Sequence, residues 1–316
     1  MKPLSEPWAA VVMSASWADP GAVVKRDPLF SEERLRKLLS VFNEVVVKSA
    51  HALDMPAVNK CYEPTFVWNC AWEQLDLLLL RYSAGHPIAN LEQHLLLLLD
   101  LWERSEQRAA AVWSEAEREP RRRWQGNVSF YNRCFWLVGL AFALELEDAP
   151  WQRLLKLMGN EGQDALLDRV IATRQPGRVV GTALCHPKPY ARLLAVLDGA
   201  RDRQPALLLD FVTHWYAELD RPPRKGMSRL SNLEERPDWH GNHEGVSSYF
   251  GYWCVEAVAV VKAFGVDDAL CLGHPNYPGD LLRPHGPSTH PAGEAIEVHG
   301  APPAKPGLLQ RLRRAL

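Results

Sequence analysis

The residues best suited to chemistry lie in the stretch DWHGNHEG, residues 238–245. It contains four side chains of the kinds that bind metal ions: Asp238, His240, His243 and Glu244. Zinc proteases place a glutamate inside H-E-x-x-H, so that both histidines share one face of a helix. Here Gly241 and Asn242 separate the two histidines and favour a turn. The spacing therefore predicts a polar loop without a metal, and a metal-dependent enzyme remains only the weaker alternative.

Other catalytic signatures do not occur in the sequence. It contains no G-x-S-x-G nucleophile elbow, no P-loop and no G-x-G-x-x-G dinucleotide fingerprint. Its six cysteines form no C-x-x-C pair, and four of them lie in apolar periodic segments, where small buried thiols are common. We therefore predict a protein without catalytic residues or cofactor, in a reducing compartment.

One carboxylate lies inside an apolar segment. Glu256 belongs to the stretch YFGYWCVEAVAVVKAFG, where it needs a hydrogen-bond donor such as a tyrosine, an arginine or the indole of Trp253. This setting favours a structural hydrogen bond over catalysis. Tyr249, Tyr252, Trp253 and Glu256 follow helical spacing, so we expect one helix over about 246–264, ended by Gly265.

Helices are the elements expected to position these residues. Apolar residues recur at helical spacing after Ser31, which is a credible N-cap. Further helical segments are expected at about 65–83, 88–113, 127–147, 151–158, 161–173, 188–199, 204–219 and 246–264. Only GRVVGTA, residues 177–183, is compatible with a short strand. The pattern predicts an all-α fold of about nine to eleven mostly antiparallel helices joined by short turns.

The stretch that starts at Trp124 resembles the stretch that starts at Trp239. In both, a W-x-G-N motif is followed by a tyrosine, a tryptophan, an apolar segment expected to be helical and acidic residues at its end. This pattern indicates either two similar helical halves or a chance likeness. We divide the chain into an N-terminal helical domain (1–120), a C-terminal helical domain (121–283) and a disordered tail rich in proline, glycine and histidine (284–316). The polar stretch RPPRKGMSR is an alternative boundary. The tail histidines, including His290, are expected to be solvated.

Composition and charge restrict the partners. The 316 residues are 47% hydrophobic and 23% charged, with a net charge of −2, so there is no general basic field for nucleic acid. No window of eighteen mostly apolar residues free of charge occurs, and the stretch WAAVVMSASWA is too short and interrupted for a convincing signal peptide. We therefore predict a cytoplasmic protein that binds neither nucleic acid nor membrane directly.

Two parts of the sequence resemble a known family. The stretch YFGYWCVEAVAVVKAFGVDD, followed by YPGDLLRP, is similar to the C-terminal domain of the PoNi family, immunity proteins paired with polymorphic nuclease toxins. The stretch WNCAWEQLDLLLLRYSAGHPIANLEQHL is similar to the N-terminal domain of the same proteins. The two stretches fall within residues 30–284, most of which the resemblance covers.

The resemblance implies a function and a set of signature residues. It implies an all-helical protein that binds a cognate DNase effector, delivered in bacterial competition by a contractile (type VI) or related secretion system, and blocks it in the cytoplasm. The residues that match the family signature, interpreted mainly as determinants of the fold, are Tyr249, Gly251, Tyr252, Trp253, Glu256, Asp267, Asp268, Tyr277, Pro278 and Asp280.

A nuclease inhibitor can offer carboxylates to the cationic surface that binds DNA phosphates. The best local match is NLEERPDWHGNHEG, residues 232–245, which we expect to be a mobile acidic loop with an aromatic anchor. The expected partner-binding residues are Glu234, Glu235, Asp238, Trp239 and Glu244. A helical interaction scaffold without a nuclease partner is the alternative, and the sequence leaves the oligomeric state open.

Overall fold

A computed structural model of the protein describes residues 24–221, 236–242 and 248–291. These residues form ten α-helices, α2 to α11, with short 3-10 turns and without any β-strand. The all-α prediction is therefore confirmed, and the stretch at 177–183 is a loop. Within the same residues, no helix is long and apolar enough to cross a membrane.

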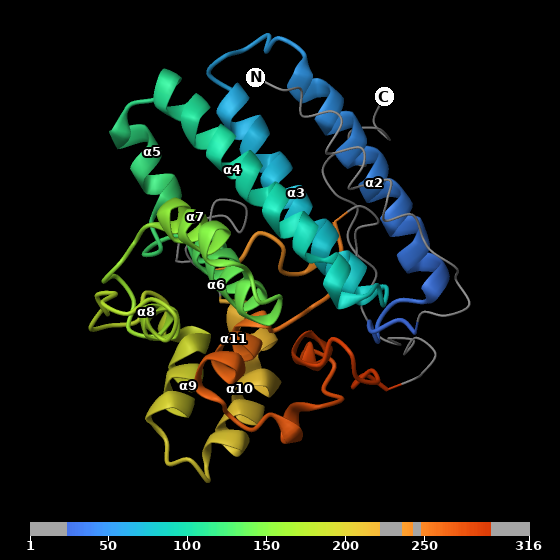
Figure 1. The fold of residues 1–316 in the computed structure, drawn as a ribbon, viewed down its shortest axis with the longest axis vertical. Coiled ribbons are helices and arrows are strands. Elements are labelled where there is room, and N and C mark those ends of the chain that lie inside the picture. The colour runs from blue at the N-terminus through green and yellow to red at the C-terminus, as the bar shows by residue number, and fades with distance from the viewer. Residues whose placement is uncertain (1–23, 222–235, 243–247, 292–316) are drawn as a thin grey trace, which may run out of the picture.

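Three long helices form the N-terminal part of the fold (Figure 1): α2 (Glu32–Asp54), α3 (Glu63–Ser83) and α4 (Glu92–Val112). Helix α3 packs against both α2 and α4, and most of its residues from Cys70 to Ser83 are buried. Ser31 caps α2 by accepting a hydrogen bond from the backbone N–H of Arg34, as its sequence position predicts. The short helix α5 (Glu115–Arg122) follows α4 and begins with a capping box between Ser114 and Glu117.

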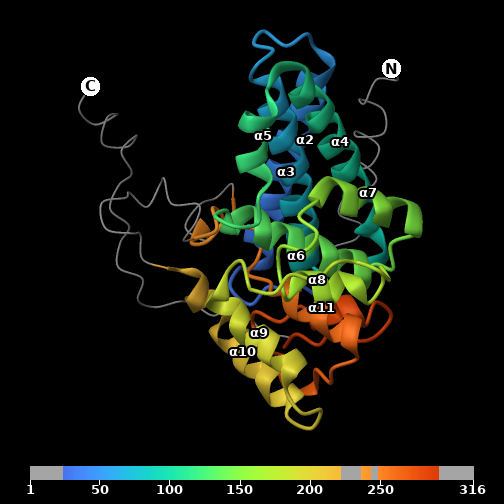
Figure 2. The same ribbon diagram turned by 90° about the vertical axis from the view of Figure 1, so that its left-hand side faces the viewer.

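Helix α6 (Val128–Ala143) is the centre of the molecule, because every one of its residues is buried. It packs against α11 (Val255–Phe264), and the two helices approach closely at Gly139, where a Cβ atom would lie 2.7 Å from the carbonyl oxygen of Val255. Around this pair lie α7 (Asp148–Met158), α8 (Leu167–Ala172), α9 (Pro187–Asp198) and α10 (Gln204–Leu219). Helices α9 and α10 pack together at the end of the molecule opposite the tips of α2, α3 and α4 (Figure 2).

The aromatic stretch before α11 is not helical, which corrects the expected helix over 246–264. Gly251 has φ +108°, and a Cβ atom there would lie only 2.1 Å from the indole nitrogen of Trp253. This left-handed backbone breaks any helix and is open chiefly to glycine. Helix α11 therefore begins only at Val255, and it ends at Gly265 in the left-handed conformation, as expected.

The two W-x-G-N turns have the same local form. Gly126 and Gly241 have φ of +81° and +84°, and Trp124 and Trp239 are both buried. In each turn the asparagine N–H donates to the carbonyl of the tryptophan. The likeness ends there, because α6 begins immediately after the first turn whereas α11 begins more than ten residues after the second.

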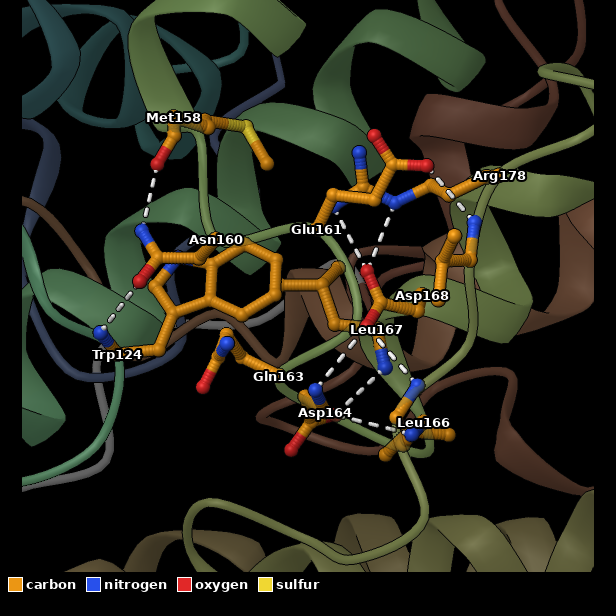
Figure 3. A network of polar contacts seen from close by, with 12 residues as sticks. Trp124, Met158, Asn160, Glu161, Gln163, Asp164, Leu166, Leu167, Asp168 and Arg178 are labelled. Atoms are coloured by element: carbon orange, nitrogen blue, oxygen red, sulfur yellow. Dashed lines mark hydrogen bonds and ion pairs between the residues drawn. The ribbon is translucent and has the colours of Figure 1, made fainter.

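The loop around α8 replaces most of the helix expected at 161–173. Figure 3 shows its polar network, in which Asp164 accepts backbone hydrogen bonds from Leu166 and Leu167 at 2.9 and 2.7 Å. Asp168 pairs with Arg178 at 2.7 Å. These buried carboxylates satisfy backbone N–H groups that an irregular loop leaves without helical partners.

The chain beyond residue 283 continues to pack against the body, which corrects the expectation that the tail is disordered from residue 284. Ser288 and Thr289 donate hydrogen bonds to Asp280 at 2.9 and 2.8 Å. His290 is buried rather than solvated, and its ring nitrogen bonds the hydroxyl of Tyr82 at 2.9 Å. Residues 284–291 are therefore part of the fold.

Candidate partner-binding site

Several signature residues join the two ends of the described chain. The hydroxyl of Tyr249 donates to Asp27 at 2.6 Å, and Arg26 pairs with Asp280 at the same distance. The indole of Trp253 donates to the hydroxyl of Ser83, at the end of α3, at 2.7 Å. These contacts connect residues 24–30 and α3 to the segment 248–291, so they hold the fold together.

A second signature group closes the turn after α11. Asp268 accepts a hydrogen bond from the hydroxyl of Tyr277 at 2.6 Å and forms an ion pair with Arg283 at 2.5 Å. Burial alone would raise the pKa of Asp268, but the hydrogen bonds from Arg283 and Tyr277 hold it below its usual value. Pro278 is buried beside this group, whereas Asp267 is exposed and accepts only from the backbone of Ala269.

Glu256 lies at the centre of a buried hydrogen-bond network. Its carboxylate accepts from four side chains of α6, α9 and α10, at 2.6 to 3.0 Å: Asn132, Trp136, Tyr190 and Trp215. Burial raises the pKa of Glu256 to about 7, although these donors oppose the rise. A tyrosine is among the partners, as expected, but Trp253 is not. The carboxylate and all four donors are buried in the protein core.

Trp239 belongs to the same core network, which corrects its expected role as an aromatic anchor on the surface. Its side chain is 1% exposed, and its indole N–H donates to the side-chain oxygen of Asn132 at 2.9 Å. The ring also lies 4.9 Å from that of Trp136. A residue held in this way cannot contact a partner without opening the core.

The neighbouring His240 is fully engaged. Its Nδ1 accepts from Arg236 at 3.1 Å, so its Nε2 carries the proton and donates to the carbonyl of Tyr216 at 2.9 Å. Both ring nitrogens therefore have protein partners. Within the part of the chain that the structure describes, three or more potential metal ligands nowhere come together.

Asp238 is the described carboxylate of the predicted acidic loop that faces solvent. Its side chain is 44% exposed and forms an ion pair with Arg133 at 3.2 Å, while its backbone N–H donates to Ser129 at 2.9 Å. The other expected carboxylates of this loop, Glu234, Glu235 and Glu244, lie outside the described residues, as does His243.

Asp238 stands at the edge of a cleft that α3, α4, α5 and α6 form. The cleft has a volume of about 460 Å³. Aromatic rings from two of these helices form its floor: Trp68 and Trp72 of α3 and Phe130 of α6, with Trp113 after the end of α4. We did not predict this cleft from the sequence, although the spacing of Trp68 and Trp72, four residues apart on one helix, was a possible signal.

Charged groups surround these rings. Arg133 lies between Asp238 and Asp76, at 3.2 and 3.9 Å, with its guanidinium 5.2 Å from the ring of Trp72. Burial raises the pKa of Asp76 to about 7, although Arg133 lowers it. The guanidinium of Arg121, which also lines the cleft, lies 4.5 Å from the ring of Trp113. An aromatic cleft with charges at its rim is typical of sites that bind a partner.

Comparison with known proteins identifies the family. A family model described as "PoNe immunity protein (PoNi), N-terminal" matches residues 26–156, and one described as "PoNe immunity proteins (PoNi), C-terminal" matches residues 162–281. Residues 121–156, which we assigned to the C-terminal domain, lie within the N-terminal match, and our boundary at residue 120 stays a prediction.

The crystal structure of protein PA2201 from Pseudomonas aeruginosa has a similar fold, with a TM-score of 0.61 and 17% sequence identity over 88% of this chain and 94% of that one. No curated protein matches the sequence significantly. The two family matches follow each other in the order of the family and cover most of the chain. The chain therefore belongs to the PoNi family of PoNe immunity proteins.

Proposed function

We propose that this protein binds a cognate DNase toxin in the cytoplasm of the producing cell and inhibits it, protecting that cell when bacteria compete through type VI or related secretion. The observation that carries the proposal is the pair of family matches over residues 26–156 and 162–281. An immunity protein needs a stable complex with its toxin and no chemistry of its own. A structural role for Glu256 agrees with this.

Occlusion is the proposed mechanism of inhibition. A nuclease needs a cationic surface to hold DNA phosphates, so carboxylates of an inhibitor can occupy the same surface. The acidic loop supplies Asp238 at the rim of the cleft, and Glu234, Glu235 and Glu244 adjoin it in sequence. Opposite charges also accelerate the encounter of the two proteins, an effect that salt screens.

Co-expression with the toxin encoded beside this protein tests the function. We expect cells that make both proteins to survive, and the two proteins to purify as a complex in which DNA cleavage is suppressed. A catalytically inactive toxin should bind equally well, because occlusion does not need turnover. Cell death together with the absence of a complex would refute the proposal.

The contribution of the loop can be measured with isosteric neutral residues. We propose changing Glu234, Glu235 and Glu244 to Gln together with Asp238→Asn. Toxin affinity should fall by about tenfold or more at low salt, mainly through slower association. The matched control removes four exposed carboxylates on other parts of the surface: Glu33, Glu44, Glu147 and Asp202. An equal loss in both variants would show only a general charge effect and would exclude the loop.

A further inference from the structure

The floor of the cleft is an apolar surface that the described residues leave partly open. The ring of Trp68, only partly buried, lies 5.0 Å from that of Trp72 and 5.9 Å from that of Phe130. The volume of about 460 Å³ falls within the range of about 300–1,000 Å³ that is usual for binding pockets. This is enough room for a large side chain and its neighbours.

Arginines dominate the walls, because four of them face only two carboxylates among the lining residues. Arg118 and Arg122 are held by Glu115 at 2.5 and 2.6 Å. Arg121 is exposed, and in the described part of the chain it makes no ion pair. One lip of the cleft therefore offers an exposed cation beside the ring of Trp113.

A buried group on the other side also lacks an acceptor. Arg133 is about nine-tenths buried and pairs with Asp238, yet its Nε has no hydrogen-bond partner within the described residues. A buried donor without an acceptor is unfavourable, so an acceptor that reached this group would be stabilised there. The cleft therefore favours a ligand with an anionic or carbonyl oxygen.

The surface next to the cleft indicates whether the ligand is a protein or a small molecule. The loop between α2 and α3 exposes three apolar side chains, Met55, Val58 and Tyr62. It leads directly into Pro64 and Thr65, which line the cleft. Clustered exposed apolar side chains mark protein–protein contacts, so a protein suits this surface better than a small molecule.

We propose that this cleft receives a segment of the toxin in which a large apolar side chain stands beside a carboxylate. The apolar side chain lies against Trp68 and Phe130, and the carboxylate pairs with Arg121. The inference rests on the proposed function and adds the site and the chemistry of the bound segment. Since Asp238 also lines the cleft, a toxin docked here also meets this carboxylate.

A photo-crosslinking amino acid in the cleft tests the contact. We propose p-benzoylphenylalanine at Thr65, with the same residue at Asn69 as control, since Asn69 is exposed on α3 but does not line the cleft. Each full-length variant is co-expressed with an inactive toxin. The Thr65 variant should crosslink to a toxin peptide with a large apolar residue within two positions of Asp or Glu, and the Asn69 variant should not.

Charge reversal provides an independent measurement. Arg121→Glu should weaken toxin binding by about tenfold or more. Arg123→Glu should change it less than about threefold, because Arg123 is also exposed but pairs with Glu119 and does not line the cleft. Circular dichroism would verify that both variants are folded. Equal effects of the two substitutions would overturn the proposal.

The outcomes separate this inference from the proposed function. If the wild-type protein does not purify with the toxin, the proposed function fails and the inference fails with it. Three other outcomes are a protective complex in which the residue at position 65 crosslinks only to this chain, to a toxin segment without an apolar residue beside a carboxylate, or to nothing. In each of these cases the cleft is not the docking site, and the proposed function stands.

Discussion

Glu256 is the residue at which side chains from distant parts of the sequence meet. Four donors from three helices converge on its carboxylate, and one of them, Asn132, also accepts from the indole of Trp239. This signature residue in the first turn of α11 therefore joins α6, α9, α10 and α11 with the turn at residue 239. Its position among apolar residues marked it as buried, but did not identify its partners.

Replacing this carboxylate tests its structural role. Glu256→Ala should lower the free energy of unfolding by about 3–5 kcal/mol, because it leaves several buried donors without an acceptor and creates a cavity. Chemical denaturation at neutral pH measures the change. The control Glu33→Ala, at an exposed position of α2, should change it by less than about 0.5 kcal/mol. A small effect at Glu256 would mean that the network contributes little.

The pH dependence of stability provides a second test of this residue. Burial raises the pKa of Glu256 from 4.5 to about 7. The folded state then binds the proton more tightly than the unfolded state. The stabilisation that protonation of Glu256 contributes is therefore complete below pH 4.5 and is lost as the pH rises through 7.

The stability of the wild type relative to Glu256→Gln should therefore decrease between about pH 4.5 and 7. Asp76, whose pKa burial also raises to about 7, is present in both proteins, so its effect cancels in the comparison. Denaturant midpoints across this range measure the difference. A constant or growing advantage of the wild type would contradict the raised pKa.

At the scale of elements, the packing of α6 against α11 decides how the two halves of the fold meet. Gly139 allows this approach, because a Cβ atom there would lie 2.7 Å from the carbonyl oxygen and 2.8 Å from the side chain of Val255. Helical periodicity predicted both helices, but not their contact, since sequence spacing does not show which faces meet.

Gly139→Ala tests this contact through the sign of its effect. At an unconstrained helix position, replacing glycine by alanine stabilises a protein by about 0.5–1 kcal/mol. Here the added methyl group must push α11 away, so we expect a destabilisation of about 1–3 kcal/mol. Thermal unfolding followed by circular dichroism distinguishes the two results. A raised melting temperature would show that the helices are not this close.

At the scale of the whole molecule, the two ends of the described chain are joined to each other. Arg26 pairs with Asp280, which also accepts hydrogen bonds from Ser288 and Thr289. The ring of His290 lies 5.2 Å from that of Trp253 and 6.0 Å from that of Tyr82. The last described residues therefore pack over the contacts between the two ends of the described chain, which we call the terminal seam.

Two truncated chains measure how much the terminal seam contributes to the free energy of unfolding. A chain ending at Arg283 lacks residues 284–291, whereas a chain ending at Pro291 keeps them. We expect the shorter chain to be less stable by at least about 2 kcal/mol, because it loses several hydrogen bonds of about 0.5–1.5 kcal/mol each and the packing of His290. Equal denaturation midpoints would show that residues 284–291 do not contribute to stability.

The sequence by itself determined the helical class, the cap at Ser31, the helix end at Gly265 and the family. These features depend on local spacing and on residue types, which the sequence states directly. Only the tertiary structure decided that Trp239 and His290 are buried, that the chain around Gly251 is not helical, and that a cleft forms beside Asp238. Each of these depends on contacts between residues far apart in the chain, and burial is set by those contacts rather than by the residue's neighbours in sequence.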